Sequence, residues 1–285
     1  MTDVSIVAAS GRFDPAKLQL GLDFLAQGSF LPTYTPVAHD HQPYLAGSDA
    51  ERTTNLIAAL EGPSSVLWLA RGGYGAARLL PHLSLAQIKR ANKVLVGFSD
   101  ATALHALWAR AGLRSVHGAN VTTLPDWSAS ARQELFALVT HPGSCCYEGL
   151  PWRGGDTVCG PLLGGNLTVL QCLAGTSFLP SFRDAIVFFE DVGEQPYRLH
   201  RAVTQLIHCG AFVEAAGFAI GQLTPREAAG THDPRACREA VCTALEPLGK
   251  PILGNLPLGH ETSSRAVQLG VDATLDTVRG RLLVG

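Results

Sequence analysis

The 285-residue sequence lacks the features that usually mark membrane-bound and nucleic-acid-binding proteins. It has no run of about 18 consecutive apolar residues, the length a membrane span needs. Its first apolar stretch, Val4 to Ala9, is too short for a signal-peptide core and has no basic lead-in. The formal net charge of −2 gives no reason to expect nucleic acid or an anionic membrane as a partner. We therefore expect a cytoplasmic globular protein of enzyme size.

The sequence also lacks the motifs that usually mark metal and phosphate sites. The seven cysteines are odd in number and have no metal-ligand spacing, so we interpret them as reduced thiols. The segment His39-Asp40-His41 holds possible ligands, but two histidines and one aspartate in a loop are weak support for a metal. Neither G-x-x-x-x-G-K-[ST] nor G-x-G-x-x-G occurs, which excludes the usual phosphate-binding loops. We expect no metal site.

Strand and helix patterns alternate in the first half of the chain. Short apolar runs predict strands at 4–10, 64–70 and 94–96. Helices are indicated by the spacing of Leu18, Leu22 and Leu25, and by possible capping boxes at Ser48/Glu51 and Ser84/Gln87. Buried strands separated by helices are typical of a parallel sheet covered on both faces, with sites beyond the carboxyl ends of the strands. The first half therefore predicts a Rossmann-like α/β domain with a mostly parallel sheet.

The second half has a different pattern. Residues 126–160 are rich in Pro, Gly, Ser and Trp, which indicates a connection between domains 1–125 and 161–285. Residues 161–175 favour a loop entering a helix, and 184–191 favour a strand. Helices are expected after Pro196 and near Pro234, because proline suits the first helical turn. We expect a smaller, mixed α/β second domain.

Ser99 lies where a predicted strand turns sharply into a helix. A serine before a helix commonly caps it, because the side-chain oxygen accepts a free backbone N–H. A tight corner can also hold a hydroxyl outward as a nucleophile, although "GFSD" lacks the second glycine of G-x-S-x-G. The residues of this stretch alone leave both interpretations open.

Other candidates lie at the same predicted sheet edge or in later loops. "RGGYG" (71–75) is either a simple turn or a loop that aims backbone N–H groups and Arg71 at an anion. Three acidic residues lie at the end of the strand predicted at 184–191 or just after it: Glu190, Asp191 and Glu194. Glu190 directly ends the apolar run of that strand. Three histidines compete as a general base: His260 in a Gly-Pro loop, His117 after a predicted strand and His105 on the predicted helix behind Ser99.

Five motifs together resemble one family. They are "ARGGYGAARLL" (70–80), "VGFSDATALH" (96–105), "GGNLTVLQCLAGT" (164–176), "FFEDVGEQPYRLHR" (189–201) and "LPLGH" (256–260). In this order and with this spacing they resemble the LD-carboxypeptidases of bacterial peptidoglycan recycling, which are serine peptidases with a Ser-Glu-His triad. The resemblance covers nearly the whole chain and favours the nucleophile interpretation of Ser99.

The resemblance implies Ser99 as nucleophile, Glu190 as the orienting carboxylate and His260 as general base, at the interface of the two domains. It implies a cytoplasmic homodimer without cofactor. It also implies a muropeptide tetrapeptide substrate that loses its terminal D-alanine from an L-centre. For the oxyanion we expect the backbone N–H groups of Gly73 and Asp100 as donors. Substrate contacts are expected from Arg71, Tyr74 and Asn166.

Two positions depart from the family pattern, and two other functions remain open. His200 stands where an aspartate is expected, and Ala119-Asn120 where a proline often follows His-Gly. A related branch of the family cleaves a peptidyl-nucleotide antibiotic of the microcin C type. The chain could also be a two-domain protein that binds a small ligand without catalysis. A hydrogen bond between Ser99 and His260 would favour the enzyme.

Overall fold

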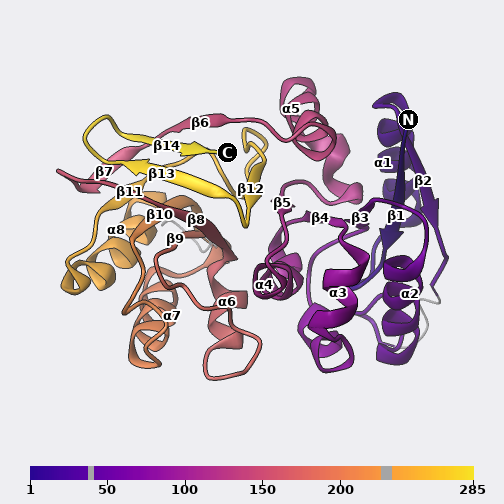
Figure 1. Ribbon diagram of the computed structural model, residues 1–285, viewed down its shortest axis with the longest axis horizontal. Helices are drawn as coiled ribbons and strands as arrows, with labels where there is room; N and C mark the ends of the chain where they lie inside the picture. Colours follow the sequence, from indigo (N-terminus) through magenta and orange to yellow (C-terminus); the bar gives the residue numbers. More distant parts are fainter. Residues whose placement is uncertain (38–41, 226–232) are drawn as a thin grey trace.

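The computed structural model describes residues 1–37, 42–225 and 233–285, and it contains two β-sheets that lie side by side (Figure 1). The first sheet and its helices come mainly from the first half of the chain, and the second sheet from the rest. The segment His39-Asp40-His41, considered as a weak metal candidate, lies outside the described residues. The predicted α/β class is confirmed.

The first sheet has the order β12-β5-β4-β3-β1-β2. Its strands are β1 (Thr2–Val7), β2 (Phe30–Tyr34), β3 (Val66–Leu69), β4 (Val94–Gly97), β5 (Ser115–His117) and β12 (Val267–Leu269). All neighbours pair in parallel except β12, which comes from near the end of the chain and runs antiparallel to β5. The order changes direction between β1 and β3, and in such doubly wound sheets ligands bind beyond the carboxyl ends at that point.

Helices cover both faces of this sheet, because its strands are apolar on both sides. One face packs against α1 (Pro15–Gln27) and α5 (Ala129–Thr140), and the other against α2 (Asp49–Glu61), α3 (Leu85–Ala91) and α4 (Thr102–Ala111). Short 3-10 helices η1 (Ala76–His82), η2 (Ser99–Ala101) and η3 (Val121–Asp126) follow β3, β4 and β5 closely. The loops at the carboxyl ends of these strands are therefore short and held by helices.

The second sheet has the order β6-β14-β13-β8-β9-β10-β11-β7. Its strands are β6 (Cys145–Glu148), β7 (Leu150–Arg153), β8 (Thr157–Asn166), β9 (Ile186–Glu194), β10 (Gly217–Pro225), β11 (Ile252–Gly254), β13 (Asp272–Asp276) and β14 (Arg281–Val284). The four central strands β8 to β11 are parallel, and the outer pairings are antiparallel. This is the mixed sheet that the second half predicts.

Three helices pack on one face of the second sheet: α6 (Leu167–Leu173), α7 (Pro196–His208) and α8 (Pro234–Leu245), which the short η4 (Glu246–Leu248) follows. Helix α4 of the first half contacts both β8 and α6, so the two halves meet next to the helix that follows Ser99 (Figure 1). None of the helices in the described ranges combines the length and apolarity of a membrane span.

Some local expectations hold and others do not. The capping box at Ser84 and Gln87 is present in full, and Ser48 Oγ accepts the Glu51 N–H at 3.2 Å. The expected connection over 126–160 contains α5, β6 and β7, and the two strands form the edges of the second sheet. The loop expected before α6 was wrong, because β8 continues to Asn166, directly before that helix.

Candidate active site

Ser99 occupies a strained corner at the carboxyl end of β4. Its φ angle is 62°, in the left-handed region that costs a residue with a Cβ about 1–2 kcal/mol. Phe98 and Ala101 occupy the cap positions of η2 and α4, and neither helix start has a side-chain cap bond. The alternative interpretation of Ser99 as a helix cap is therefore not observed, and the partly exposed Ser99 hydroxyl has no hydrogen-bond partner among the described residues. Such strain is a common feature of functional sites.

The glycine-rich loop after β3 lies directly against Ser99. A Cβ built on Gly72 would come within 3.0 Å of Ser99 Cβ and 3.2 Å of its Oγ, so a larger residue would displace the serine. The Gly72 carbonyl accepts the Gly11 N–H from the loop after β1 at 3.0 Å, and Gly73 follows with a φ angle of 102°. The two loops thus meet where the strand order changes direction.

The Asp100 side chain ties this loop to the Ser99 corner. Its Oδ2 accepts the Ala76 N–H at 2.8 Å, and the side chain is buried. Burial raises the pKa of Asp100, while Ala76 and the nearby Arg52 act in the opposite direction. Asp100 therefore fixes the loop through its side chain, and its backbone N–H stands next to Ser99 in the chain.

Glu190 and His260 form a buried pair in the second half. Glu190 is fully buried on β9, next to Asn166 of β8 in the parallel register. His260 lies in the loop after β11, and its Nδ1 is 2.6 Å from Glu190 Oε2. A short bond to a carboxylate fixes the orientation of an imidazole and its tautomer, with Nδ1 carrying the proton.

Each partner of this pair shifts the pKa of the other. Burial alone would raise the pKa of Glu190, but His260 and His117 lower it to about 2. Burial would lower the pKa of His260, but the charge and hydrogen bond of Glu190, together with Asp191, raise it above its ordinary value. The carboxylate is therefore ionised, and it stabilises the imidazolium form of His260.

The two halves of the site meet through Phe98. The His260 ring lies with its centroid 4.4 Å from that of Phe98, the residue before Ser99. Within the described ranges, Ser99 and His260 do not hydrogen-bond each other, and the one hydrogen bond of the imidazole is made through Nδ1. Nε2 thus has no hydrogen-bond partner among the described residues, and catalytic hydrogen bonds often tighten only when substrate binds.

The two competing histidines have other surroundings. His105 is buried, with Nε2 bonded to the Gly97 carbonyl at 2.9 Å and Nδ1 to Ser115 Oγ at 2.8 Å. Burial lowers its pKa to about 3, so it is a neutral structural group. His117 is also buried, and its Nε2 lies 3.5 Å from Glu190 Oε1. Neither imidazole is exposed to a substrate.

The three expected substrate contacts lie in different settings. Arg71 is exposed and donates to the Arg12 carbonyl, at the edge of a pocket of about 360 Å³. Tyr74 is half exposed, with its ring centroid 6.0 Å from that of Tyr44. Asn166 is buried and caps α6, with Oδ1 accepting from Val169 and Nδ2 donating to Asp191. Arg71 and Tyr74 thus face open space, whereas the Asn166 amide is engaged inside the protein.

Asn120 is a supporting residue whose role the sequence did not reveal. Its buried side chain accepts the Phe98 N–H through Oδ1 at 3.4 Å. A Cβ on Gly72 would lie 3.2 Å from the Asn120 Nδ2. The amide therefore packs between the glycine-rich loop after β3 and Phe98, which precedes Ser99. The sequence marked Asn120 only as a departure from a family pattern.

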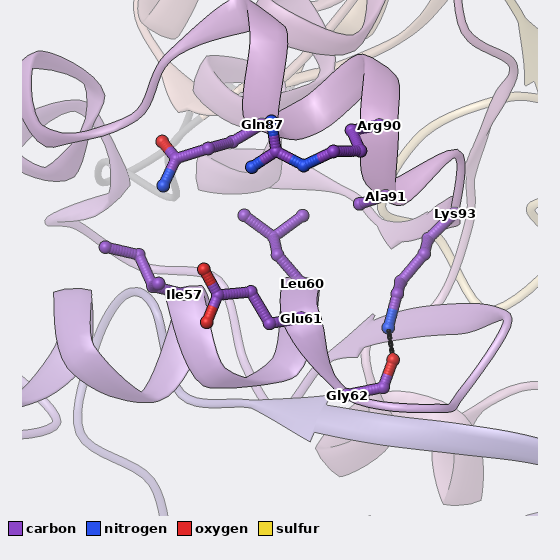
Figure 2. Close-up of a pocket in the computed structure, with 8 residues that line it drawn as sticks. All are labelled: Ile57, Leu60, Glu61, Gly62, Gln87, Arg90, Ala91 and Lys93. Atoms are coloured by element: carbon purple, nitrogen blue, oxygen red, sulfur yellow. Dashed lines mark hydrogen bonds between the residues drawn. The ribbon is translucent and has the colours of Figure 1, made fainter.

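Another pocket, of about 430 Å³, lies away from this edge. It is lined by residues of α2 and α3 and of the segments that follow them (Figure 2). Those segments lead into β3 and β4, so the pocket lies at the amino ends of these strands, whereas Ser99 follows the carboxyl end of β4. Its buried cation, Lys93, already donates to the carbonyls of Gly62 and Ala59 at 2.6 and 2.7 Å. Across the described ranges no group of three His, Cys, Asp or Glu side chains could hold a metal ion.

Known proteins share this sequence and fold. Residues 4–118 match the LD-carboxypeptidase N-terminal domain, and residues 159–275 match the LD-carboxypeptidase C-terminal domain. The murein tetrapeptide carboxypeptidase of Pseudomonas aeruginosa is 34% identical over 253 residues, which cover 84% of this chain and 81% of that protein. The chain is therefore a serine-type carboxypeptidase by class. It belongs to the LD-carboxypeptidase family, as its five motifs predict.

Solved structures agree with this assignment. The crystal structure of muramoyltetrapeptide carboxypeptidase from Oxalobacter formigenes has a TM-score of 0.88 at 27% identity and covers 100% of this chain and 99% of its own. An MccF-like protein from Bacillus anthracis has a TM-score of 0.87 at 20% identity over 99% of this chain and 96% of its own, which shows a shared fold.

Proposed function

We propose that this enzyme cleaves the L,D peptide bond that holds the terminal D-alanine of a muropeptide tetrapeptide, with Ser99, Glu190 and His260 as its triad. The observation that carries the proposal is the buried Glu190–His260 pair, whose imidazole packs on Phe98 beside the strained Ser99. The names of the Pseudomonas aeruginosa and Oxalobacter formigenes relatives support the choice of substrate.

Proton transfer follows from the tautomer of His260. Glu190 holds the proton on Nδ1, which leaves the lone pair on Nε2 to accept the Ser99 hydroxyl proton as the oxygen attacks the carbonyl carbon. The imidazolium that forms is stabilised by the Glu190 carboxylate. His260 then gives the proton to the leaving amine of D-alanine, and water releases the acyl group by the reverse sequence.

The oxyanion requires donors that are already in place. In this proposal they are the backbone N–H groups of Gly73 and Asp100. The Asp100 carboxylate and the Gly11–Gly72 hydrogen bond hold the two segments rigidly. Loss of one such donor typically costs about 100- to 1,000-fold in rate.

A carboxypeptidase must also recognise a terminal carboxylate. The pocket beside Arg71 also contains Lys17, so two cations line it, together with the carboxylates of Asp14 and Asp126. Arg71 precedes Gly72, the residue that contacts Ser99, and it is the residue we assign to the substrate carboxylate. Tyr74 is assigned to the peptide on the same loop, while a contact by Asn166 would require its amide to leave Asp191 or the helix cap.

A cytoplasmic location, a role in peptidoglycan recycling and a homodimer complete the proposal and come from the family resemblance. Membership of a peptidase family favours catalysis over the alternative of a binding protein. The microcin C alternative is the second candidate, because structures of the MccF type have the same fold.

The decisive assay measures D-alanine release from L-Ala-γ-D-Glu-meso-diaminopimelate-D-Ala. We expect wild-type enzyme and the exposed control Ser130→Ala to be active, and Ser99→Ala to lose about 10⁴-fold or more in kcat. Activity that survives Ser99→Ala would remove the serine as nucleophile. An inactive wild type would instead direct the same comparison to a peptidyl-nucleotide substrate.

A further inference from the structure

The second oxygen of Glu190 lacks a hydrogen bond, although the carboxylate is fully buried. Oε2 is 2.6 Å from His260 Nδ1, but Oε1 has no hydrogen-bond partner within the described residues. Both ring nitrogens of His117 are likewise buried without a partner, and Nε2 lies 3.5 Å from Oε1. Three unsatisfied atoms thus gather at one place behind the proposed triad.

A buried carboxylate oxygen without a donor costs considerable free energy, so native proteins nearly always provide one. His117 Nε2 is the nitrogen of a basic side chain that lies within 4 Å of Oε1. The remaining gap is a few tenths of an ångström longer than an ordinary hydrogen bond. If His117 and Glu190 moved closer by that amount, a single hydrogen bond would provide a partner both for Glu190 Oε1 and for His117 Nε2.

We propose that His117 is a positioning residue that donates its Nε2–H to Glu190 Oε1 and so holds the carboxylate between two imidazoles. The inference rests on the proposed triad. His117 is 1% exposed and is packed by the rings of Phe98 and Phe188, with centroids at 6.1 and 5.2 Å. It therefore acts through Glu190 and not as the base itself.

The place of His117 in the sheet gives this contact a second effect. His117 is the register partner of Gly97 across β4 and β5, two residues before Ser99. Glu190 belongs to β9 of the other sheet. A His117–Glu190 hydrogen bond would therefore link the sheet that carries the nucleophile to the pair that activates it, and would set the distance between them.

The charged surroundings determine how the pH profile should respond. Glu190 faces His117, His260 and the neighbouring carboxylate Asp191, and the neutral His105 ring lies 6.2 Å from that of His117. Loss of the donor on Oε1 leaves the charge of Glu190 less compensated, which strengthens its attraction to the His260 imidazolium. The acid limb of kcat/KM should then move to higher pH.

The test compares His117→Phe, which keeps a ring but has no donor, with His117→Gln, which keeps a donor. We expect His117→Phe to lower kcat about 10- to 100-fold, the range typical when a hydrogen-bonding partner behind a metal ligand is lost. For His117→Phe, KM should stay nearly constant and the acid limb of kcat/KM should move to higher pH. His117→Gln should recover most of the lost kcat. The exposed His141 provides the matched control His141→Phe, which should leave kcat and the pH profile unchanged.

Three outcomes would overturn the inference while Ser99→Ala remains inactive. The first is a wild-type kcat and acid limb in His117→Phe, and the second is a loss as complete as that of Ser99→Ala, which would be more than a positioning residue accounts for. The third is equal activity in His117→Gln and His117→Asn, since the shorter asparagine side chain cannot reach Glu190 Oε1. If His117→Phe fails to fold, the comparison of these two amide variants still tests the inference. An active Ser99→Ala would instead refute the proposed triad.

Discussion

Ser99 has a Cβ at a φ angle of 62°, so replacing it by glycine should stabilise the fold while it removes the nucleophile. The left-handed conformation costs a residue with a Cβ about 1–2 kcal/mol. Glycine escapes this cost but loses about 0.5–1 kcal/mol through the greater freedom of its unfolded chain. The difference between these ranges predicts that Ser99→Gly is more stable than Ser99→Ala by up to about 1.5 kcal/mol, with a central value of about 0.75 kcal/mol.

Ser99→Ala is the proper reference because it removes the same hydroxyl and keeps the Cβ. The Ser99 hydroxyl has no hydrogen-bond partner in the described part of the chain, so neither variant loses a bond. Urea unfolding followed by circular dichroism would give the two free energies of unfolding. Both variants should be inactive.

The control pair is placed at Ser130, which is exposed in the first turn of α5. There the backbone is helical, and Ser130→Gly should be less stable than Ser130→Ala, by up to about 1 kcal/mol. The order of stabilities should thus be opposite at the two positions. A Ser99→Gly variant that is no more stable than Ser99→Ala would refute the claim that strain is stored at this corner.

Two further predictions test the loop and the buried pair. Gly72→Ala would bring a Cβ within 3.0 Å of Ser99 Cβ, and because a displacement of a reacting group by about 1 Å can lower the rate about 100-fold, kcat/KM should fall by at least tenfold. The control Gly143→Ala, whose Cβ would have no neighbour closer than 3.9 Å, should keep the wild-type kcat/KM. Equal activities of the two variants would contradict the contact between Gly72 and Ser99. Because Glu190 raises the pKa of His260, kcat/KM should increase with pH through an apparent pKa above that of an ordinary histidine. Glu190→Gln should lower both this pKa and kcat, the latter by about 100- to 10,000-fold. An unchanged pH profile would exclude Glu190 as the orienting group.

The local pattern of the sequence predicted the parts of the fold that depend on neighbouring residues. Apolar runs marked β1, β3 and β4 because these strands are buried on both faces, and Ser84 and Gln87 marked the start of α3 because a capping box is a short-range interaction. The strands β6 and β7 were not predicted because each is short, lies at an edge of the second sheet and leaves at least half of its residues exposed. Their pairing depends on segments more than 90 residues away, which the local pattern does not contain.

The candidate site was predictable only as a set of separate motifs. The family resemblance assigned the roles of Ser99, Glu190 and His260, and the structure adds the bond between the last two and the Phe98 contact. The chemistry around Asn120 and His117 could not be derived from the sequence, because each depends on which atoms face it across a sheet or between two halves. His117 in particular looked like a rival base, and only its burial behind Glu190 indicates a different role.

Division of the site between two sheets explains why so many buried polar groups surround it. Ser99 and Glu190 are brought together by the packing of α4, η2 and β12 against β8 of the second sheet, so an error of about one ångström in that packing would separate nucleophile and base. Apolar contacts alone tolerate such shifts, whereas hydrogen bonds restrict distance and angle. Thr102 Oγ1, which accepts the Asn166 N–H at 2.9 Å, already makes one such bond between the halves. A donor from His117 to Glu190 would add another such bond, at the buried pair itself, and each added bond restricts the rotation that the others alone would permit.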